Sequence, residues 1–185
     1  MTSTAQRSLI ALALLAVMAA TRSHHFASVL GPGDASLAAF FLGGLYLRRI
    51  GWLGLFLATA AVVDFAAIQS GVSSWCVTPG YVMLAPAYGA LWLAGHLATG
   101  ITRSAAGLLR GGLLLAGGTL AFFVASNAGF YFLSGYFSDL GVGEFALRVG
   151  TYLPAYLTQA FLYSGLGLAL GLAADRARPR DAANA

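Results

Sequence analysis

The chain has 185 residues, of which 59% are hydrophobic and only 9% are charged. A soluble domain of this length cannot bury so much apolar surface, so the composition excludes an ordinary globular protein and predicts an integral membrane protein. The net charge of +4 comes from ten arginines against six acidic residues, and the arginines lie at the ends of apolar runs, which argues against nucleic-acid binding.

Apolar runs of about 20 residues recur along the chain, and they are continuous rather than alternating. In hydrocarbon only helices and closed barrels satisfy every backbone N–H and C=O, and strict alternation would be typical of a barrel. The sequence therefore predicts an all-α integral membrane protein, a compact six-transmembrane-helix bundle in one domain over residues 1–175. A charged tail, 176–185, is expected to be disordered. The predicted spans cover residues 8–20, 35–47, 50–68, 81–101, 108–133 and 145–174.

The first run, 8–20, permits two interpretations. Its short apolar centre and its small residues, Ala16, Ala19 and Ala20, are typical of a secretory signal peptide. The following segment, 26–30, is apolar enough to extend a helix, and cleavage would leave an odd number of spans. We therefore expect the first helix to be retained in the membrane.

The distribution of arginines predicts the orientation of the bundle. With both termini in the cytoplasm, eight of the ten arginines lie inside and only Arg22 and Arg148 lie outside, as the positive-inside rule favours. This orientation places three polar segments on the outer face: residues 22–34, residues 134–144, and residues 70–83, which we call the cysteine segment because they contain the only cysteine. We therefore expect a binding site formed by these segments to lie on the outer face of the membrane.

Two ionisable residues occupy unusual positions within the predicted spans. Asp64 lies roughly 20 Å from the inner end of the third span, and Arg148 lies near the outer start of the sixth. An ionisable residue inside a span is expensive unless it is paired or lines a polar cavity, so both are candidate site residues. A purely structural Asp64–Arg148 pair, or a pair between Arg148 and Glu144 four residues earlier, is the alternative interpretation.

Polar and aromatic side chains gather near the predicted outer ends of the helices. Such stripes more often pack or form an interfacial belt than bind a ligand. Here they converge beneath the cysteine segment, which is what a pocket for a large, flat, partly polar ligand needs. The residues are Tyr81, Tyr88 and Trp92 in the fourth span, Asn127 and Tyr131 in the fifth, and Tyr152, Tyr156, Gln159 and Tyr163 in the sixth.

Cys76 has no second cysteine with which to form a disulfide, so it is either an inert thiol or a reactive, metal-ligating one. Met83 follows it closely, and a thiolate with a thioether suits a soft or borderline metal rather than zinc in a closed site. The chain contains no P-loop motif, so it does not hydrolyse ATP itself.

Several motifs together resemble one family. They are His24 after the first span, GGLYLRR at the end of the second, Asp64 in the third, WCVTPGYVM before the fourth and SNAGFYFLSG in the fifth. With them, the whole membrane part resembles the BtuM-type vitamin B12 transporters, which are related to the substrate-binding S-components of energy-coupling-factor (ECF) transporters.

The resemblance implies uptake of cobalamin across the inner membrane, with the Cys76 thiolate as an axial ligand of the cobalt. It also implies that His24, Asp64, Tyr81, Met83 and Arg148 shape the site, with His25 as an alternative to His24. The tyrosines, Tyr131 among them, and Asn127 are expected to serve the amide-bearing rim of the corrin. Electron donation by the thiolate would also labilise an upper ligand, which makes cysteine-assisted decyanation a further expectation.

The expected partners are cobalamin, the lipid bilayer and, as an open alternative, an ECF energising module of ATPases with a coupling membrane protein. Three other functions stay open. An S-component for a different vitamin would leave Cys76 without a role. A membrane redox enzyme would ordinarily need a second thiol, and an assembly protein would bind no small molecule.

Overall fold

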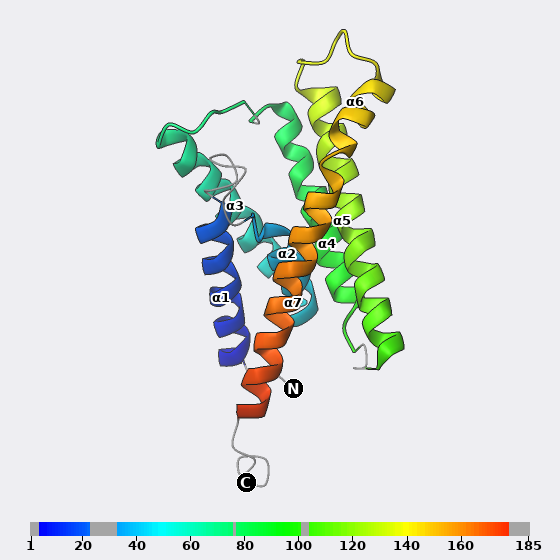
Figure 1. Cartoon of the computed structure of the whole chain (residues 1–185). Coiled ribbons are helices and arrows are strands. Elements are labelled where there is room, and N and C mark those ends of the chain that lie inside the picture. The colour runs from blue at the N-terminus through cyan, green and yellow to red at the C-terminus, as the bar shows by residue number, and fades with distance from the viewer. Residues whose placement is uncertain (1–3, 23–32, 76, 101–103, 178–185) are drawn as a thin grey trace.

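The computed structural model describes residues 4–22, 33–75, 77–100 and 104–177. Throughout these ranges the ordered elements are helices, and none is a strand, so the prediction of an all-α protein is confirmed. The elements are α1 (Thr4–Arg22), α2 (Ser36–Tyr46), α3 (Ile50–Gln69), the 3-10 helix η1 (Pro79–Met83), α4 (Leu84–Leu97), α5 (Ala105–Leu133), α6 (Val142–Gly150) and α7 (Leu153–Ala177), as labelled in Figure 1.

Four of these helices are long and apolar enough to cross a membrane: α1, α3, α5 and residues 153–174 of α7. Large apolar side chains project from their outward faces, including the exposed Leu12, Val62, Leu109 and Leu162. Extended apolar surface of this kind is unfavourable in water and normal in lipid. The structure therefore indicates a helical membrane protein, and the count of six spans stays a prediction.

The two remaining predicted spans are shorter or divided. Helix α2 has 11 residues, about 16 Å at 1.5 Å per residue, against about 30 Å of hydrocarbon. The fourth run begins as η1, where the Thr78 hydroxyl accepts a hydrogen bond from the Gly80 N–H and Pro79 occupies the first turn. The predicted continuous run 145–174 is wrong, because a turn at residues 151–152 separates α6 from α7. Pro154, which lacks an N–H, is tolerated in the first turn of α7 but not inside one unbroken helix.

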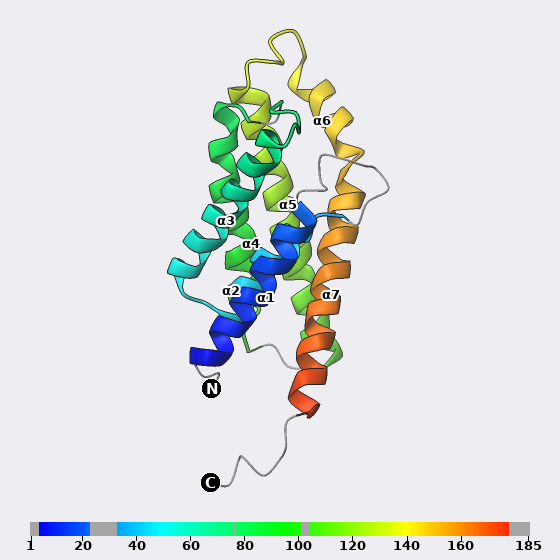
Figure 2. The ribbon, with the colours of Figure 1, turned by 90° about the vertical axis from the view of Figure 1, so that its left-hand side faces the viewer.

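Helix α2 forms the centre of the fold. Every residue from 36 to 44 is buried, and the helix packs against α1, α3, α4 and α7. The Phe40 ring stacks on Tyr88 of α4 with 4.0 Å between ring centroids, and its edge meets Phe56 of α3 at 5.7 Å. A short, mostly apolar helix is thus enclosed by its longer neighbours (Figure 2).

Glycines allow α2 and α4 to approach until their backbones touch. A Cβ atom added at Gly95 of α4 would lie 1.9 Å from the Phe41 carbonyl oxygen, and one at Gly44 of α2 would lie 2.0 Å from the Trp92 carbonyl oxygen. Small residues at helix contacts are how membrane bundles gain close van der Waals packing. This contact fixes the depth of α4, and so of η1 before it, relative to the start of α2.

The ends of the elements divide between the two ends of the molecule. Helix α1 begins, α7 ends and α5 begins at one end, whereas the α5–α6 connection lies at the opposite end, drawn uppermost in Figures 1 and 2. Residues 70–75, the start of the cysteine segment, reach the same upper end, where Trp75 stacks on Tyr136 of the connection. The segment that follows α3 and the segment that follows α5 therefore meet at one end of the bundle.

Candidate functional site

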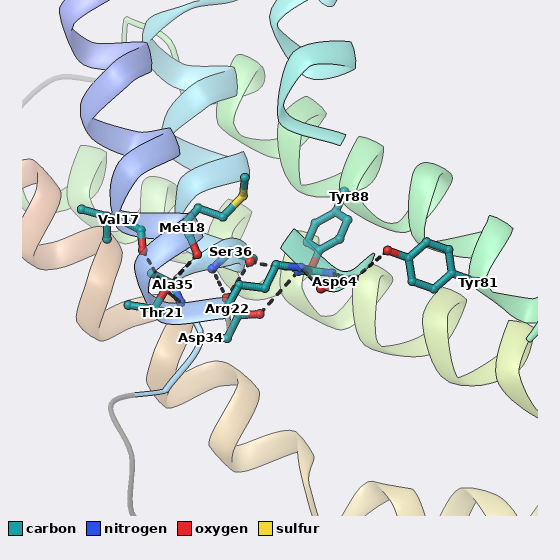
Figure 3. Close-up of polar contacts among 10 residues, drawn as sticks. All are labelled: Val17, Met18, Thr21, Arg22, Asp34, Ala35, Ser36, Asp64, Tyr81 and Tyr88. Atoms are coloured by element: carbon teal, nitrogen blue, oxygen red, sulfur yellow. Dashed lines mark hydrogen bonds and ion pairs between the residues drawn. The ribbon is translucent and has the colours of Figure 1, made fainter. Parts of the chain in front are cut away.

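Arg22, the last residue of α1, carries a charge into the interior of the bundle. Its side chain is 7% exposed although the surrounding helices are strongly apolar. The end of α1 is held against the start of α2, because the Ala35 N–H donates to the Thr21 hydroxyl at 3.0 Å. This contact directs the arginine toward α3 and α4, as Figure 3 shows.

Arg22 and Asp64 of α3 form a bidentate ion pair. The Arg22 Nε donates to Asp64 Oδ1 at 2.6 Å, and Nη2 donates to Oδ2 at 2.7 Å. Asp64 is only 4% exposed, and its Oδ2 also accepts a hydrogen bond from the Tyr81 hydroxyl of η1 at 2.6 Å. Parallel N–H···O bonds between a guanidinium and a carboxylate are strong and fix the relative orientation of both groups.

The other side of the guanidinium faces α2 and α4. Nη1 donates to the Ser36 hydroxyl at 3.0 Å and to the Tyr88 hydroxyl at 2.7 Å. Asp34 lies at 3.6 Å from Nη1 and accepts hydrogen bonds from the Ser36 backbone N–H and hydroxyl. We call these six residues, Arg22, Asp34, Ser36, Asp64, Tyr81 and Tyr88, the Arg22 cluster. It contains one guanidinium and two carboxylates.

A pocket of about 170 Å³ opens directly beside the Arg22 cluster, between α3 and the η1–α4 segment. Arg22, Tyr81 and Tyr88 of the cluster are among the residues that line it, and nearly all of its surface is apolar. The pocket is therefore an apolar cavity that adjoins a polar cluster, a combination that binding sites often have. Its aliphatic lining residues are Leu57, Ala60, Ala61, Val82, Leu84 and Ala85.

The structure brings together only some of the predicted site residues. Asp64 and Tyr81 share a hydrogen bond at the pocket. Met83 lies two residues further along η1 but packs against α5, since a Cβ atom at Gly129 would lie 2.5 Å from the Met83 Cβ. Asn127 donates to the Phe123 carbonyl of its own helix at 2.8 Å, and the Tyr131 hydroxyl donates to the Leu140 carbonyl at 2.6 Å. The polar groups of these two α5 residues are thus used within the upper end of the bundle.

Of the two ion pairs considered for Arg148, the pair with Asp64 is wrong. Arg148 is exposed on α6, and its Nη2 donates to Glu144 at 2.5 Å, one helical turn earlier. Asp64 instead forms its ion pair with the guanidinium of Arg22. The turn at residues 151–152 explains the difference, because it separates α6 from the spanning part of the run and leaves Arg148 facing outward with a partner on its own helix. The alternative Arg148–Glu144 pair is confirmed.

Three predicted site residues, His24, His25 and Cys76, lie outside the described residues. The cysteine segment is anchored on both sides of Cys76. On one side the Trp75 ring stacks on Tyr136, with centroids 4.0 Å apart and planes 11° from parallel. On the other side η1 carries Tyr81 to Asp64. The segment thus runs from the aromatic contact at the α5–α6 connection to the Arg22 cluster.

Sequence reasoning missed the central role of Arg22 and the contributions of Ser36 and Tyr88 to its binding. The charge rule placed Arg22 among the residues outside the membrane, yet Asp64, a carboxylate within a predicted apolar span, had no cation nearby in sequence. That imbalance was the available signal, because a buried carboxylate requires a partner.

Among the described residues, no group of three or more His, Cys, Asp or Glu side chains is placed to hold a metal ion. No protein-family model matches the chain, and no curated protein matches it.

Proposed function

We propose that this chain is a cobalamin transporter of the bacterial inner membrane, with six spans, both termini inside and an S-component-like substrate site on the outer side. The observation that carries the proposal is the Arg22 cluster with its pocket. A buried, hydrogen-bonded ion pair between membrane helices, beside a cavity, is a candidate functional site by default. The sequence resemblance supplies the identity of the substrate.

The distance along the chain supports one shared site. Cys76 and Tyr81 are five residues apart, so their Cα atoms are separated by at most about 18 Å even in a fully extended chain. Tyr81 lines the pocket and is bonded to Asp64. A corrin ring bound over the cysteine segment is therefore within reach of the pocket through its side arms.

The chemistry of Cys76 fits the substrate. Cobalt(III) in cobalamin takes two axial ligands, and a thiolate is a soft, strongly donating one. In the exchange, the sulfur lone pair forms the Co–S bond and the displaced ligand leaves with its own electron pair, so the oxidation state does not change. A strongly donating ligand on one face weakens the bond on the opposite face, which is the basis for the proposed release of cyanide.

The size of the pocket defines which part of the substrate it takes. A volume of about 170 Å³ is comparable to the roughly 150 Å³ cavity that accommodates benzene. The pocket is too small for the corrin ring and suits a single side group. The ring itself belongs over the cysteine segment, with the pocket as a subsite.

Six spans follow if α2 and the η1–α4 segment cross as the shorter pair among four long helices. An even number of crossings agrees with α1 beginning and α7 ending at one end of the molecule (Figure 1). Because the sequence has no P-loop, energy for transport comes from a separate ECF module or from the substrate gradient alone.

The test is an absorption spectrum of detergent-purified protein after incubation with cobalamin and removal of free ligand. We expect a retained corrinoid whose visible bands are shifted in the native chain and in Ser74→Ala, an exposed control in the same segment. In Cys76→Ala the shift should disappear. A retained but unshifted corrinoid in the native chain would remove the thiolate ligand, and no retained corrinoid would overturn the proposed function.

A further inference from the structure

The pocket beside the Arg22 cluster contains an arginine, and an arginine in a pocket ordinarily indicates an anionic ligand such as a carboxylate or phosphate. The contacts of Arg22 argue against that interpretation. Four of the five N–H groups of a guanidinium are already used: two bond Asp64, one bonds Ser36 and one bonds Tyr88. Little of the donor capacity is left for a ligand.

The charge of the cluster argues in the same direction. Asp64 pairs with Arg22 through both oxygens, and Asp34 lies at 3.6 Å from the same guanidinium, so two carboxylates share one cation. The N-terminus of α2 offsets part of the charge at Asp34. Arg22 is the charged residue among those that line the pocket, but the cluster to which it belongs carries two carboxylates against one guanidinium. The charge of Arg22 is therefore already neutralised within the cluster, and a carboxylate that entered the pocket would find no free cation to compensate the loss of its hydration.

The group that the pocket does offer is an acceptor. Tyr81 gives its hydroxyl hydrogen to Asp64, and its oxygen has two lone pairs, of which the neighbouring Arg22 guanidinium takes at most one, so the oxygen of this half-buried, pocket-lining side chain can still accept one hydrogen bond. The bond to a carboxylate also makes that oxygen a better acceptor, because hydrogen bonds in a chain polarise one another. Around it the wall is aliphatic, from Leu57 and Ala60 on α3 to Leu84 on α4.

We infer that this pocket is a specificity subsite that receives a neutral carboxamide arm of the substrate and rejects the corresponding carboxylate. A primary carboxamide supplies two N–H donors at the end of a short alkyl stem, which matches the acceptor, the aliphatic wall and the volume of about 170 Å³. The inference rests on the proposed function in one respect: cobalamin carries such amide arms on its corrin rim.

The experiment compares cobalamin with its monocarboxylate derivatives, in each of which one rim amide has been hydrolysed to the acid. Affinities are measured by competition on the purified full chain at a fixed ionic strength. At least one isomer should bind about 10-fold more weakly than cobalamin or worse, since 1.4 kcal/mol is a factor of ten. Equal affinity of all isomers would overturn the subsite and leave the proposed function standing.

A pair of variants tests whether the discrimination comes from the cluster. Asp34→Asn removes one of the two carboxylates, while the amide oxygen still accepts a hydrogen bond from the Ser36 N–H. The penalty, which is the ratio of the affinity for cobalamin to the affinity for the weakest-binding monocarboxylate, should therefore shrink severalfold. The matched control, Asp139→Asn, makes the same change at an exposed residue of the α5–α6 connection and should leave the penalty intact. An equal penalty in Asp34→Asn and in the native chain would contradict the electrostatic origin.

A separate measurement decides the case in which the native chain retains no corrinoid. Propionamide and propionate, at equal concentration and ionic strength, are compared for their effect on the thermal unfolding of the purified protein. Greater stabilisation by propionamide supports the subsite even though the proposed substrate has failed. Equal or greater stabilisation by propionate rejects the subsite.

Discussion

Arg22 suits its place because a guanidinium satisfies several acceptors in one plane. It bonds both oxygens of Asp64 and the hydroxyls of Ser36 and Tyr88, which lie on three other helices. A lysine has a single ammonium nitrogen and no planar array of N–H donors, so it cannot reproduce this geometry. The arginine therefore links the end of α1 to α2, α3 and α4, and through Asp64 it positions Tyr81 at the pocket.

The first prediction concerns the energy of the Arg22–Asp64 pair. Arg22→Met should destabilise the protein by about 3–5 kcal/mol, because it leaves the Asp64 carboxylate buried without a cation. The double variant Arg22→Met with Asp64→Leu should be more stable than Arg22→Met alone, since both charges are then removed. Reversible unfolding in mixed micelles measures the free energies.

Arg148→Met provides the control for that cycle, because it makes the same chemical change at the exposed Arg148–Glu144 pair. Pairs of this kind contribute about 0.3–0.5 kcal/mol, so the effect should be small. If Arg22→Met were no more harmful than Arg148→Met, the interpretation of Arg22 as the centre of a buried network would have to be abandoned.

For single residues, the sequence reveals which side chains are chemically unusual but not which of them are in contact. Asp64 and Tyr81 could be selected because a carboxylate in a span and a tyrosine at a span's start are recognisable in one dimension. The partner of Asp64 could not be selected, since Arg22 and Arg148 were both expected outside and only the packing of α1 against α3 distinguishes them. Asn127 and Tyr131 lay on an expected face, yet local backbone acceptors take up their polar groups.

Among the elements, the α2–α4 contact sets the positions of the others. The two backbones touch at Gly44 and Gly95, and Trp92 of α4 fills the space beside Gly43. Because η1 continues directly into α4, the same contact determines where Tyr81 stands relative to Asp64. A contact on the far side of the core thus supports the candidate site.

The second prediction compares two glycines of α4. Gly95→Ala should destabilise the protein by about 1–3 kcal/mol or more, because the new methyl group would overlap the Phe41 carbonyl oxygen and a backbone atom cannot swing away. Gly89→Ala adds the same methyl group in open space on the same helix and should be neutral or slightly stabilising. Thermal unfolding of the two purified variants decides between them, and similar midpoints would contradict the backbone contact.

The sequence predicted the helices better than it predicted their ends. Long apolar runs identify α1, α3, α5 and most of α7, because continuous hydrophobicity in a membrane protein has few other interpretations. Apolar composition did not register the turn at residues 151–152, because this turn lies in a segment nearly as hydrophobic as the helices around it. It also cannot distinguish the 3-10 geometry of η1, which begins at Pro79 within the cysteine segment, from the start of an α-helix. Pro79 and Pro154 were the local signals, and each marks a helix start.

The whole molecule has two chemically different ends. The end where α1 begins and α7 ends also holds the start of α5, while the α5–α6 connection and the Trp75–Tyr136 stack lie at the other end (Figures 1 and 2). The excess of arginine near the chain termini predicts that the first of these ends faces the cytoplasm. On that prediction, the α5–α6 connection and the Trp75–Tyr136 stack face the periplasm.

The third prediction tests that orientation by cysteine labelling in a Cys76→Ser background. A cysteine at exposed Ser138, in the α5–α6 connection, should react with a membrane-impermeant maleimide in intact cells with a permeabilised outer membrane. A cysteine at exposed Ala105, at the start of α5, should react only after the inner membrane is opened. The reverse pattern would invert the topology and place the pocket on the cytoplasmic side.

The enclosure of α2 also constrains how the protein is made. This helix follows α1 closely in synthesis, but three of the helices that cover it, α3, α4 and α7, are synthesised later, α7 last of all. At 11 residues it is too short to be held stably in lipid as an independent span. Insertion of α2 therefore depends on its neighbours, and a ribosome stalled before residue 153 would leave the central helix covered on only part of its surface.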